Sequence, residues 1–390
     1  MPYCEVDAAL NNGIKIFYRT YGHGPTKVLL IIGLAGTHDS WGPQIQGLTG
    51  TEKPNDGDVD RNPCNEDGNN DGCVEVCAFD NRGIGRSSVP TSRTDYTTTV
   101  MAKDAIALLD HLGWSKAHVF GHSMGAMIAC KLAAMVPDRV LSLAVLNVTG
   151  GGFECFPKFD RQTLNIAIRF LKAKTPEQRA AVDLDTHYTK EYLEEYVGSR
   201  TRRAILYQEY VKGISATGMQ SSFGFDGQIH ACWRHKMTKS EINFIRSAGF
   251  LVSVIHGRHD IIAQMYYARR LAEKLQPNAR MIDLHGGHLV SHERPDEVNQ
   301  ALLELIKASE LKTDPKDWTN LPKKSSGLWG TGMTYGPISS GGSHVSFMFV
   351  ILDKLYLFLL YLFGLLVFAF EYARKGIRRI NPVRVGASLA

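Results

Sequence analysis

The sequence predicts an α/β protein whose mostly parallel sheet is flanked by helices on both faces. Apolar runs alternate with helical patterns from about residue 14 to residue 309. KVLLIIGL (27–34) and CVEVCAF (73–79) are continuous apolar runs, which are typical of strands buried on both faces. VMAKDAIALLDHLG (100–113) instead has the period of an amphipathic helix and ends on a glycine. Strands that alternate with helices pair in parallel, because each helix returns the chain to the same edge of the sheet.

One segment interrupts this alternation. Between VLSLAVLNV (140–148) and GFLVSVIHG (249–257) the pattern is largely helical with no strong strand, which indicates a cap inserted into the core. After residue 310 the composition shifts to Gly, Ser, Pro and Lys, which is typical of a linker. We expect six parts: a first core part at 1–150 that carries an acidic loop insertion at 51–72, a helical cap at 151–245, a second core part at 246–310, a linker at 311–344, a transmembrane helix at 345–372 and a basic tail at 373–390.

Composition and charge exclude one class of partner. The net charge of +5 is mild for 390 residues, and no basic stripe with interleaved aromatics is present, so we expect no nucleic acid partner. The seven cysteines are odd in number and irregularly spaced, and no secretory signal precedes them. We therefore expect reduced thiols and a cytosol-facing domain.

The loop insertion carries two patterns that could suggest a metal. DGNNDG (67–72) matches the opening of a calcium loop, but the twelfth position is Ala78 rather than Glu, and a strand follows in place of a helix. Cys64, Cys73 and Cys77 lack a fourth zinc ligand. We therefore expect no metal and no cofactor.

The apolar segment at 345–372 predicts a membrane anchor. Leu355 to Phe370 carries no charge, and Lys354 at its upstream end is long enough to snorkel to the interface. We expect a single-pass C-terminal anchor with the large domain in the cytosol, in the endoplasmic reticulum or an organelle outer membrane. Five basic residues in the tail favour the opposite orientation by the positive-inside rule.

The stretch FGHSMGA (120–126) predicts a nucleophile. A strand, AHVF, precedes Ser123 and a small-residue helix, MGAMIACKLA, follows it. Gly121 and Gly125 flank the serine, where a side chain would collide with the strand and the helix. Ser123 therefore lies at a sharp turn that exposes its hydroxyl. The alternative is a structural serine in a turn.

A serine hydroxyl needs a base and an orienting carboxylate to act as a nucleophile. His288 in LHGGHLVSHERP follows the last predicted strand, and Asp260 in VIHGRHD follows the preceding one. Strand ends meet at one edge of a parallel sheet, so we expect all three side chains to converge. Other candidates for the base and the acid fit less well, and we interpret them as structural residues: His285, His292 and Asp283.

Two backbone N–H groups are candidates for an oxyanion hole, which acyl transfer requires. Met124 begins the helix after the nucleophile, and Leu34 lies in the loop IIGLAGTHDSW after an early strand. Gly33 and Gly36 let that loop approach closely.

Together these motifs resemble the α/β-hydrolase superfamily over about residues 14–309. The matching segments are the oxyanion loop, FDNRGIGRS (79–87), GHSMG, GRHD and GGHLVSHERP. The resemblance implies the α/β-hydrolase fold and a Ser-Asp-His triad, and it is a poor guide to substrate. One departure is Ile32, where members of the family usually have a histidine that steadies the oxyanion loop.

The function expected is a serine hydrolase, of esterase or lipase type, that cleaves an ester-like acyl bond of a small-molecule acyl substrate, with lipid or other apolar esters favoured by the anchor. Two alternatives stay open: a membrane-tethered small-molecule receptor on a hydrolase scaffold, and an acyltransferase. Aromatic residues of the cap either line an acyl pocket or serve simple packing: Phe153, Phe156, Phe223, Phe225 and Trp233.

Overall fold

The computed structural model describes residues 2–6, 13–55, 73–157, 161–217 and 220–322. The chain divides into two units, Met1–Pro322 and Lys323–Ala390, and every described residue belongs to the first.

Eight strands of the described residues form one sheet in the order β1-β2-β4-β3-β5-β6-β9-β10. β1 and β2 pair antiparallel, β2 and β4 pair antiparallel, and every later neighbour pair is parallel. The predicted mostly parallel sheet is confirmed. Its strands are β1 (Tyr3–Val6), β2 (Ile14–Tyr21), β3 (Thr26–Ile31), β4 (Val74–Phe79), β5 (Ala117–His122), β6 (Val140–Leu146), β9 (Leu251–Gly257) and β10 (Ala279–Leu284).

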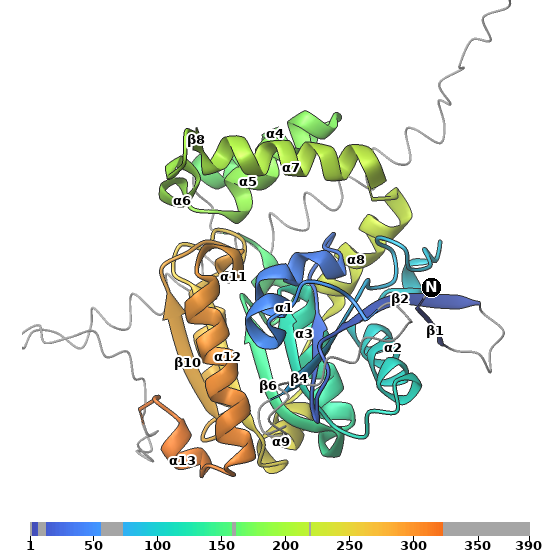
Figure 1. Cartoon of the computed structure of the whole chain (residues 1–390), viewed down its shortest axis with the longest axis vertical. Helices are drawn as coiled ribbons and strands as arrows, with labels where there is room; N and C mark the ends of the chain where they lie inside the picture. The colour runs from blue at the N-terminus through green and yellow to red at the C-terminus, as the bar shows by residue number, and fades with distance from the viewer. Residues whose placement is uncertain (1, 7–12, 56–72, 158–160, 218–219, 323–390) are drawn as a thin grey trace, which may run out of the picture. The chain divides into compact units, whose positions relative to one another are not determined.

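Helices cover both faces of this sheet (Figure 1). Met101, Ile128 and Leu271 from α2, α3 and α10 pack on one face, and Ile45 and Leu302 from α1 and α12 pack on the other. Burial of each such side chain contributes about 1.5–3 kcal/mol. The helices of the core are α1 (Gly42–Thr49), α2 (Thr98–His111), α3 (Met124–Met135), α9 (Lys239–Ser247), α10 (Met265–Lys274), α11 (Val290–Glu293), α12 (Pro295–Glu310) and α13 (Pro315–Trp318), with short 3₁₀ helices η2 (His38–Trp41), η3 (Arg93–Asp95) and η4 (Pro137–Arg139).

The segment between β6 and β9 is largely helical, and α4, α5, α6 and α7 lie together beyond the helix α11 that follows the last strand (Figure 1). α8 descends from this layer to pack against η3, and α9 packs against α3 in the core. The predicted cap boundary at residue 245 therefore falls inside α9. The elements of the segment are η5 (Gly152–Cys155), α4 (Arg161–Lys172), α5 (Pro176–His187), α6 (Lys190–Glu194), β7 (Tyr196–Val197), β8 (Arg200–Thr201), α7 (Arg202–Thr217) and α8 (Ser222–Arg234).

The cysteines differ from the sequence expectation at one position. Cys73 forms a disulfide, so the prediction that all seven thiols are reduced is wrong for this residue. The number and spacing of the cysteines describe the chain as a whole, and they do not report on the state of any one cysteine. The free thiols of the described residues are Cys4, Cys77, Cys130, Cys155 and Cys232.

Some sequence predictions concern residues outside the described ranges. The predicted transmembrane segment 345–372 and basic tail 373–390 lie outside them, as do the linker from residue 323 onward and the DGNNDG pattern (67–72). Within the described part of the chain, no helix combines the length and apolarity needed to span a bilayer.

Candidate active site

Ser123 occupies the sharp turn that the sequence predicts between β5 and α3. Its backbone is held at φ 54° and ψ −121°, a conformation that L-residues rarely adopt. A Cβ at Gly121 would lie 2.4 Å from the carbonyl oxygen of Gly125, and one at Gly125 would lie 2.0 Å from that of Ile31. The two glycines therefore permit the close strand-to-helix approach that presents the serine hydroxyl.

The three predicted side chains form one hydrogen-bonded series. His288 Nε2 lies 3.0 Å from Ser123 Oγ, and His288 Nδ1 lies 2.8 Å from Asp260 Oδ2. Asp260 follows β9, His288 follows β10, and Ser123 follows β5, so the carboxyl ends of three parallel strands bring them together.

Asp260 accepts four hydrogen bonds. Oδ1 accepts from the N–H groups of Ile262 and Ala263 at 2.8 and 2.9 Å, and Oδ2 accepts from Asn147 Nδ2 at 2.7 Å beside His288. Burial alone would raise the pKa of this carboxyl, but the neighbouring imidazoles and these donors outweigh burial and lower the pKa to about 2. Asp260 is therefore ionised and can only accept hydrogen bonds.

This ionisation fixes the tautomer of His288. An ionised Asp260 requires a hydrogen on His288 Nδ1, so in the neutral ring Nε2 carries the lone pair. That lone pair faces the hydroxyl of Ser123. The geometry can therefore remove a proton from the serine oxygen.

Both predicted oxyanion donors lie beside Ser123. Met124 is the first residue of α3, so its N–H has no acceptor within the helix. Gly33 packs so closely that a Cβ there would lie 2.9 Å from Ser123 Cβ, so the residue directly before Leu34 lies against the nucleophile. The structure thus brings together all five residues that the sequence singled out.

Asn81 steadies the oxyanion loop at the position where the family histidine is missing. Its Nδ2 donates to the carbonyl of Ile32 at 2.7 Å, and both residues are buried. An amide from the FDNRG segment thereby fixes the chain on the N-terminal side of Gly33.

Two further histidines lie beside His288, and neither was predicted to have a role in the site. His122 packs edge-on at 4.9 Å between ring centroids, and its Nε2 donates to the carbonyl of His288 at 2.8 Å. His187 from the cap lies 5.9 Å from His288, ring to ring. Burial lowers the pKa of both His122 and His187 to about 3, so both stay neutral near pH 7.

Sequence signals for these supporting residues are uneven. His122 lies within GHSMG itself, and Asn147 follows β6 at the same edge of the sheet as the triad, so both positions could have been suspected. His187 carries no comparable signal. Its position depends on how the cap folds back over the core.

Glu293 joins that cap to the loop of His288. One oxygen accepts from the N–H groups of Thr189 and Gly287 at 3.0 and 2.7 Å, and the other accepts from Thr189 Oγ1 at 2.6 Å. Glu293 is 5 % exposed, so the carboxylate is a buried link rather than a surface charge.

The rival residues have other partners. His292 binds the carbonyl of Ser40 and the hydroxyl of Tyr188 through its two ring nitrogens. His285 is exposed and contacts His259, and Asp283 pairs with Arg258. These three side chains therefore have partners other than the Ser123 hydroxyl, whose partner is His288.

The cap aromatics differ in environment. Phe156 packs on Trp233, with ring centroids 5.3 Å apart, and Phe225 stacks on Phe170 of α4. Phe153, Phe223 and Trp233 are exposed, which is not the environment of an enclosed acyl pocket.

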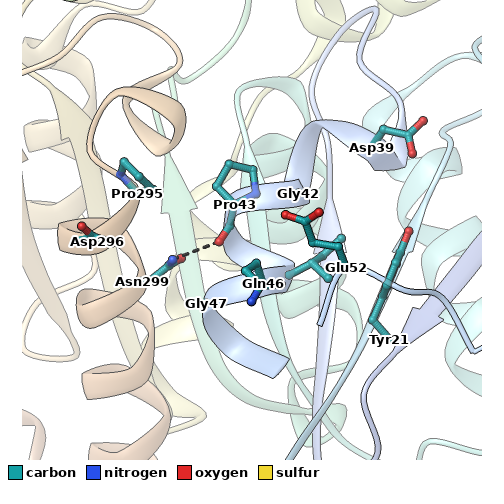
Figure 2. A pocket seen from close by; sticks show the side chains of 11 residues that line it. Tyr21, Asp39, Gly42, Pro43, Gln46, Gly47, Glu52, Pro295, Asp296 and Asn299 are labelled. Atoms are coloured by element: carbon teal, nitrogen blue, oxygen red, sulfur yellow. Dashed lines mark hydrogen bonds between the residues drawn. The ribbon is translucent and has the colours of Figure 1, made fainter. Parts of the chain in front are cut away.

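A separate hollow of about 600 Å³ lies between α1 and α12 (Figure 2). Pro43, Asp296 and Asn299 line it, and Asn299 Nδ2 donates to the carbonyl of Pro43 at 3.0 Å. No triad residue lines this hollow. Among the residues with described positions, no group of three or more His, Cys, Asp or Glu is arranged to hold a metal ion.

Comparisons with known proteins identify the family to which this fold belongs. A model of the α/β-hydrolase fold family matches residues 27–295, more than half of the chain. "Putative carbamate hydrolase RutD" of Azorhizobium caulinodans is 25 % identical over 306 residues, which cover 78 % of this chain and 97 % of that protein. "Putative non-heme bromoperoxidase BpoC" of Mycobacterium tuberculosis is 29 % identical over 231 residues, which cover 58 % of this chain and 81 % of that protein.

A solved structure has the same fold. The enol-lactonase of Burkholderia xenovorans LB400 superposes with a TM-score of 0.59 at 22 % identity and covers 78 % of this chain and all of its own. Three observations agree on the α/β-hydrolase fold: the family match, the sheet order and the position of Ser123 between a strand and a helix. The chain therefore belongs to the α/β-hydrolase fold family.

Proposed function

We propose that the chain is a serine hydrolase of esterase or lipase type that cleaves an ester-like acyl bond through an acyl-enzyme. The observation that carries this proposal is the hydrogen-bonded series from Ser123 through His288 to an ionised Asp260. A receptor has no need of a general base aligned on a serine hydroxyl at a strained turn.

The first half-reaction forms the acyl-enzyme. Ser123 Oγ attacks the substrate carbonyl carbon while its proton passes to His288 Nε2, and Asp260 stabilises the imidazolium that results. The N–H groups of Met124 and Leu34 donate to the oxyanion. When the tetrahedral intermediate collapses, the proton on Nε2 goes to the departing alcohol oxygen.

The second half-reaction repeats the chemistry with water. Water gives a proton to His288 Nε2 as its oxygen attacks the ester carbon of acylated Ser123, and the proton then returns to Ser123 Oγ. The products are an acid and a free serine. Asp260 stays ionised throughout, which agrees with its lowered pKa.

The relatives favour a carbonyl bond as the target. A carbamate and an enol lactone, named for two of them, both present a carbonyl carbon attached to a leaving oxygen or nitrogen. For this chain we propose esters with an apolar acyl group, because a segment with the composition of a membrane anchor would keep the enzyme beside such substrates.

Turnover of an acyl-length series tests the proposal. The full-length protein in detergent should hydrolyse p-nitrophenyl esters, and Ser123→Ala should lower kcat by at least about 10⁴. Ser253→Ala is the control, because it removes a serine hydroxyl that lies away from the triad, fully buried on β9. Equal turnover by Ser123→Ala and the unaltered protein would contradict the mechanism.

We also propose that the segment 345–372 anchors the chain in a membrane, from its composition alone. The disulfide at Cys73 and the basic tail both favour an oxidising compartment for the folded unit, against the cytosolic orientation that the sequence suggested. Protease added to sealed membranes should leave the hydrolase unit intact. Its digestion would establish the cytosolic orientation.

A further inference from the structure

Helix α8 of the cap lies in direct backbone contact with the core. A Cβ at Gly224 would lie 1.9 Å from the carbonyl oxygen of Gly83, and one at Gly227 would lie 2.3 Å from the ring of Tyr96. Only glycine fits at either position, so α8 is seated on the FDNRG segment and η3. This close approach carries the next residue, Gln228, into the interior.

The Gln228 side chain connects the cap to two loops of the core. It has no exposed surface, its Nε2 donates to the carbonyl of Arg82 at 3.0 Å, and its Oε1 accepts from the N–H of Ala35 at 2.9 Å. Gln220 donates to the same oxygen at 3.1 Å and to the carbonyl of Gly83 at 2.9 Å.

Ala35 immediately follows Leu34 and adopts a left-handed backbone, with φ 60°. An alanine in this region costs about 1–2 kcal/mol, so a specific contact has to hold it there. The hydrogen bond to Gln228 fixes the peptide between Leu34 and Ala35, and Asn81 fixes the carbonyl of Ile32 on the other side. The peptide that carries the Leu34 N–H is thus held at both ends.

We propose that Gln228 is the positioning residue of the oxyanion hole, through which the docked cap holds the Leu34 N–H in its donating orientation. The inference rests on the proposed hydrolase function. The hydrogen bonds that the structure gives to Gln228 go to Ala35, Gln220 and Arg82, so its effect on the oxyanion hole passes through Ala35. With this amide absent, the loop would lose the partner of Ala35, and the oxyanion would lose an aligned donor.

Gln228→Leu tests the inference, because it removes the amide and keeps a side chain of similar bulk. Asn278→Leu is the control. Asn278 is a buried amide that donates to the carbonyls of Arg246 and Phe250. It directly precedes β10, whereas His288 follows that strand, so the two residues lie at opposite ends of β10. The readouts are kcat and KM on one ester and Ki for the matching alkyl trifluoromethyl ketone, whose adduct with serine places an oxyanion in the hole.

We expect Gln228→Leu to lower kcat about tenfold and to raise Ki about tenfold, with KM changed less than about twofold. Asn278→Leu should leave the ratio of Ki to KM as in the unaltered protein. An unchanged kcat and Ki in folded Gln228→Leu would overturn the inference alone. Unaltered protein that neither hydrolyses esters nor binds the ketone would overturn the proposed function and the inference with it.

A second variant covers the case in which Gln228→Leu does not fold. In Gln228→Glu the protonated carboxyl offers the same donor and acceptor as the amide, whereas the ionised form cannot donate to the carbonyl of Arg82 and adds negative charge beside the oxyanion. We expect kcat relative to the unaltered protein to fall as pH rises from 5.5 to 9. A ratio that stays constant over this range would overturn the inference.

Discussion

His122 Nε2 donates a hydrogen bond to the main-chain carbonyl of His288 at 2.8 Å. The residue before the nucleophile therefore holds the loop that carries the base. Because the donor is the last residue of β5 and the nucleophile follows it directly, the distance between Ser123 Oγ and His288 Nε2 is controlled by one short segment.

The loss of this hydrogen bond should slow the reaction without weakening binding. His122→Phe keeps an aromatic ring against His288 and removes the donor, so we expect kcat to fall about 10- to 100-fold with KM nearly constant. His118→Phe is the control, because His118 is equally buried on the same strand and binds Ser142 Oγ. Equal kcat values for both variants would contradict the role of His122.

Asp260→Asn should lower kcat by about 10⁴, because an amide at this site can donate to His288 Nδ1 and would place the ring hydrogen on Nε2, facing Ser123. Steady-state kinetics on one ester measure the effect. Asp283→Asn, at the end of β10, should stay within about twofold. If Asp260→Asn lowered kcat only slightly, the action of His288 as a base would not depend on the tautomer with the hydrogen on Nδ1.

Acid should destabilise the fold through its buried histidines. Burial lowers the pKa of His118 to about 4, below the usual 6.5, so the unfolded chain binds more protons between these values and stability falls as pH drops from 6.5 toward 4. His118→Gln removes this titrating group. When the pH is lowered from 7 to 5, the free energy of unfolding of the variant should therefore fall by about 2 kcal/mol less than that of the unaltered protein. Urea denaturation at both pH values measures the difference; parallel losses in variant and unaltered protein would contradict it.

Removal of the Glu293 carboxylate should loosen the cap. Glu293→Ala leaves the N–H of Gly287 and both donors of Thr189 without their acceptor, so we expect a loss of about 3 kcal/mol and faster proteolysis within the cap. Glu297→Ala, exposed on α12, should change stability by less than about 0.5 kcal/mol. Thermal unfolding and limited trypsin digestion of the two variants measure the effects. Equal stability and equal digestion rates for the two variants would contradict a role of Glu293 in joining the cap to the core.

The triad could be predicted from sequence because its geometry follows from strand order. Ser123, Asp260 and His288 each follow an apolar run, and parallel strands deliver their ends to one edge. The backbone donors of Leu34 and Met124 follow from the same turns. These features depend on local pattern and on one topological rule.

The supporting residues depend on tertiary contacts that no local pattern encodes. Gln228 reaches the oxyanion loop from a helix that follows that loop by nearly two hundred positions, and only the docking of α8 on Gly83 joins them. Glu293 meets Thr189 of the cap in the same way. The disulfide of Cys73 was missed because the number and spacing of the cysteines describe the whole chain and do not report on a single residue.

The proposal that Ser123 is an activated nucleophile is tested by fluorophosphonate labelling of the full-length protein and of its Ser123→Ala variant in parallel. Such reagents capture a serine that is activated by a base and whose adduct fits an oxyanion hole. We expect one labelled site, at Ser123, and no labelling of the folded variant. Equal labelling of the variant, or no labelling of the folded unaltered protein, would contradict it.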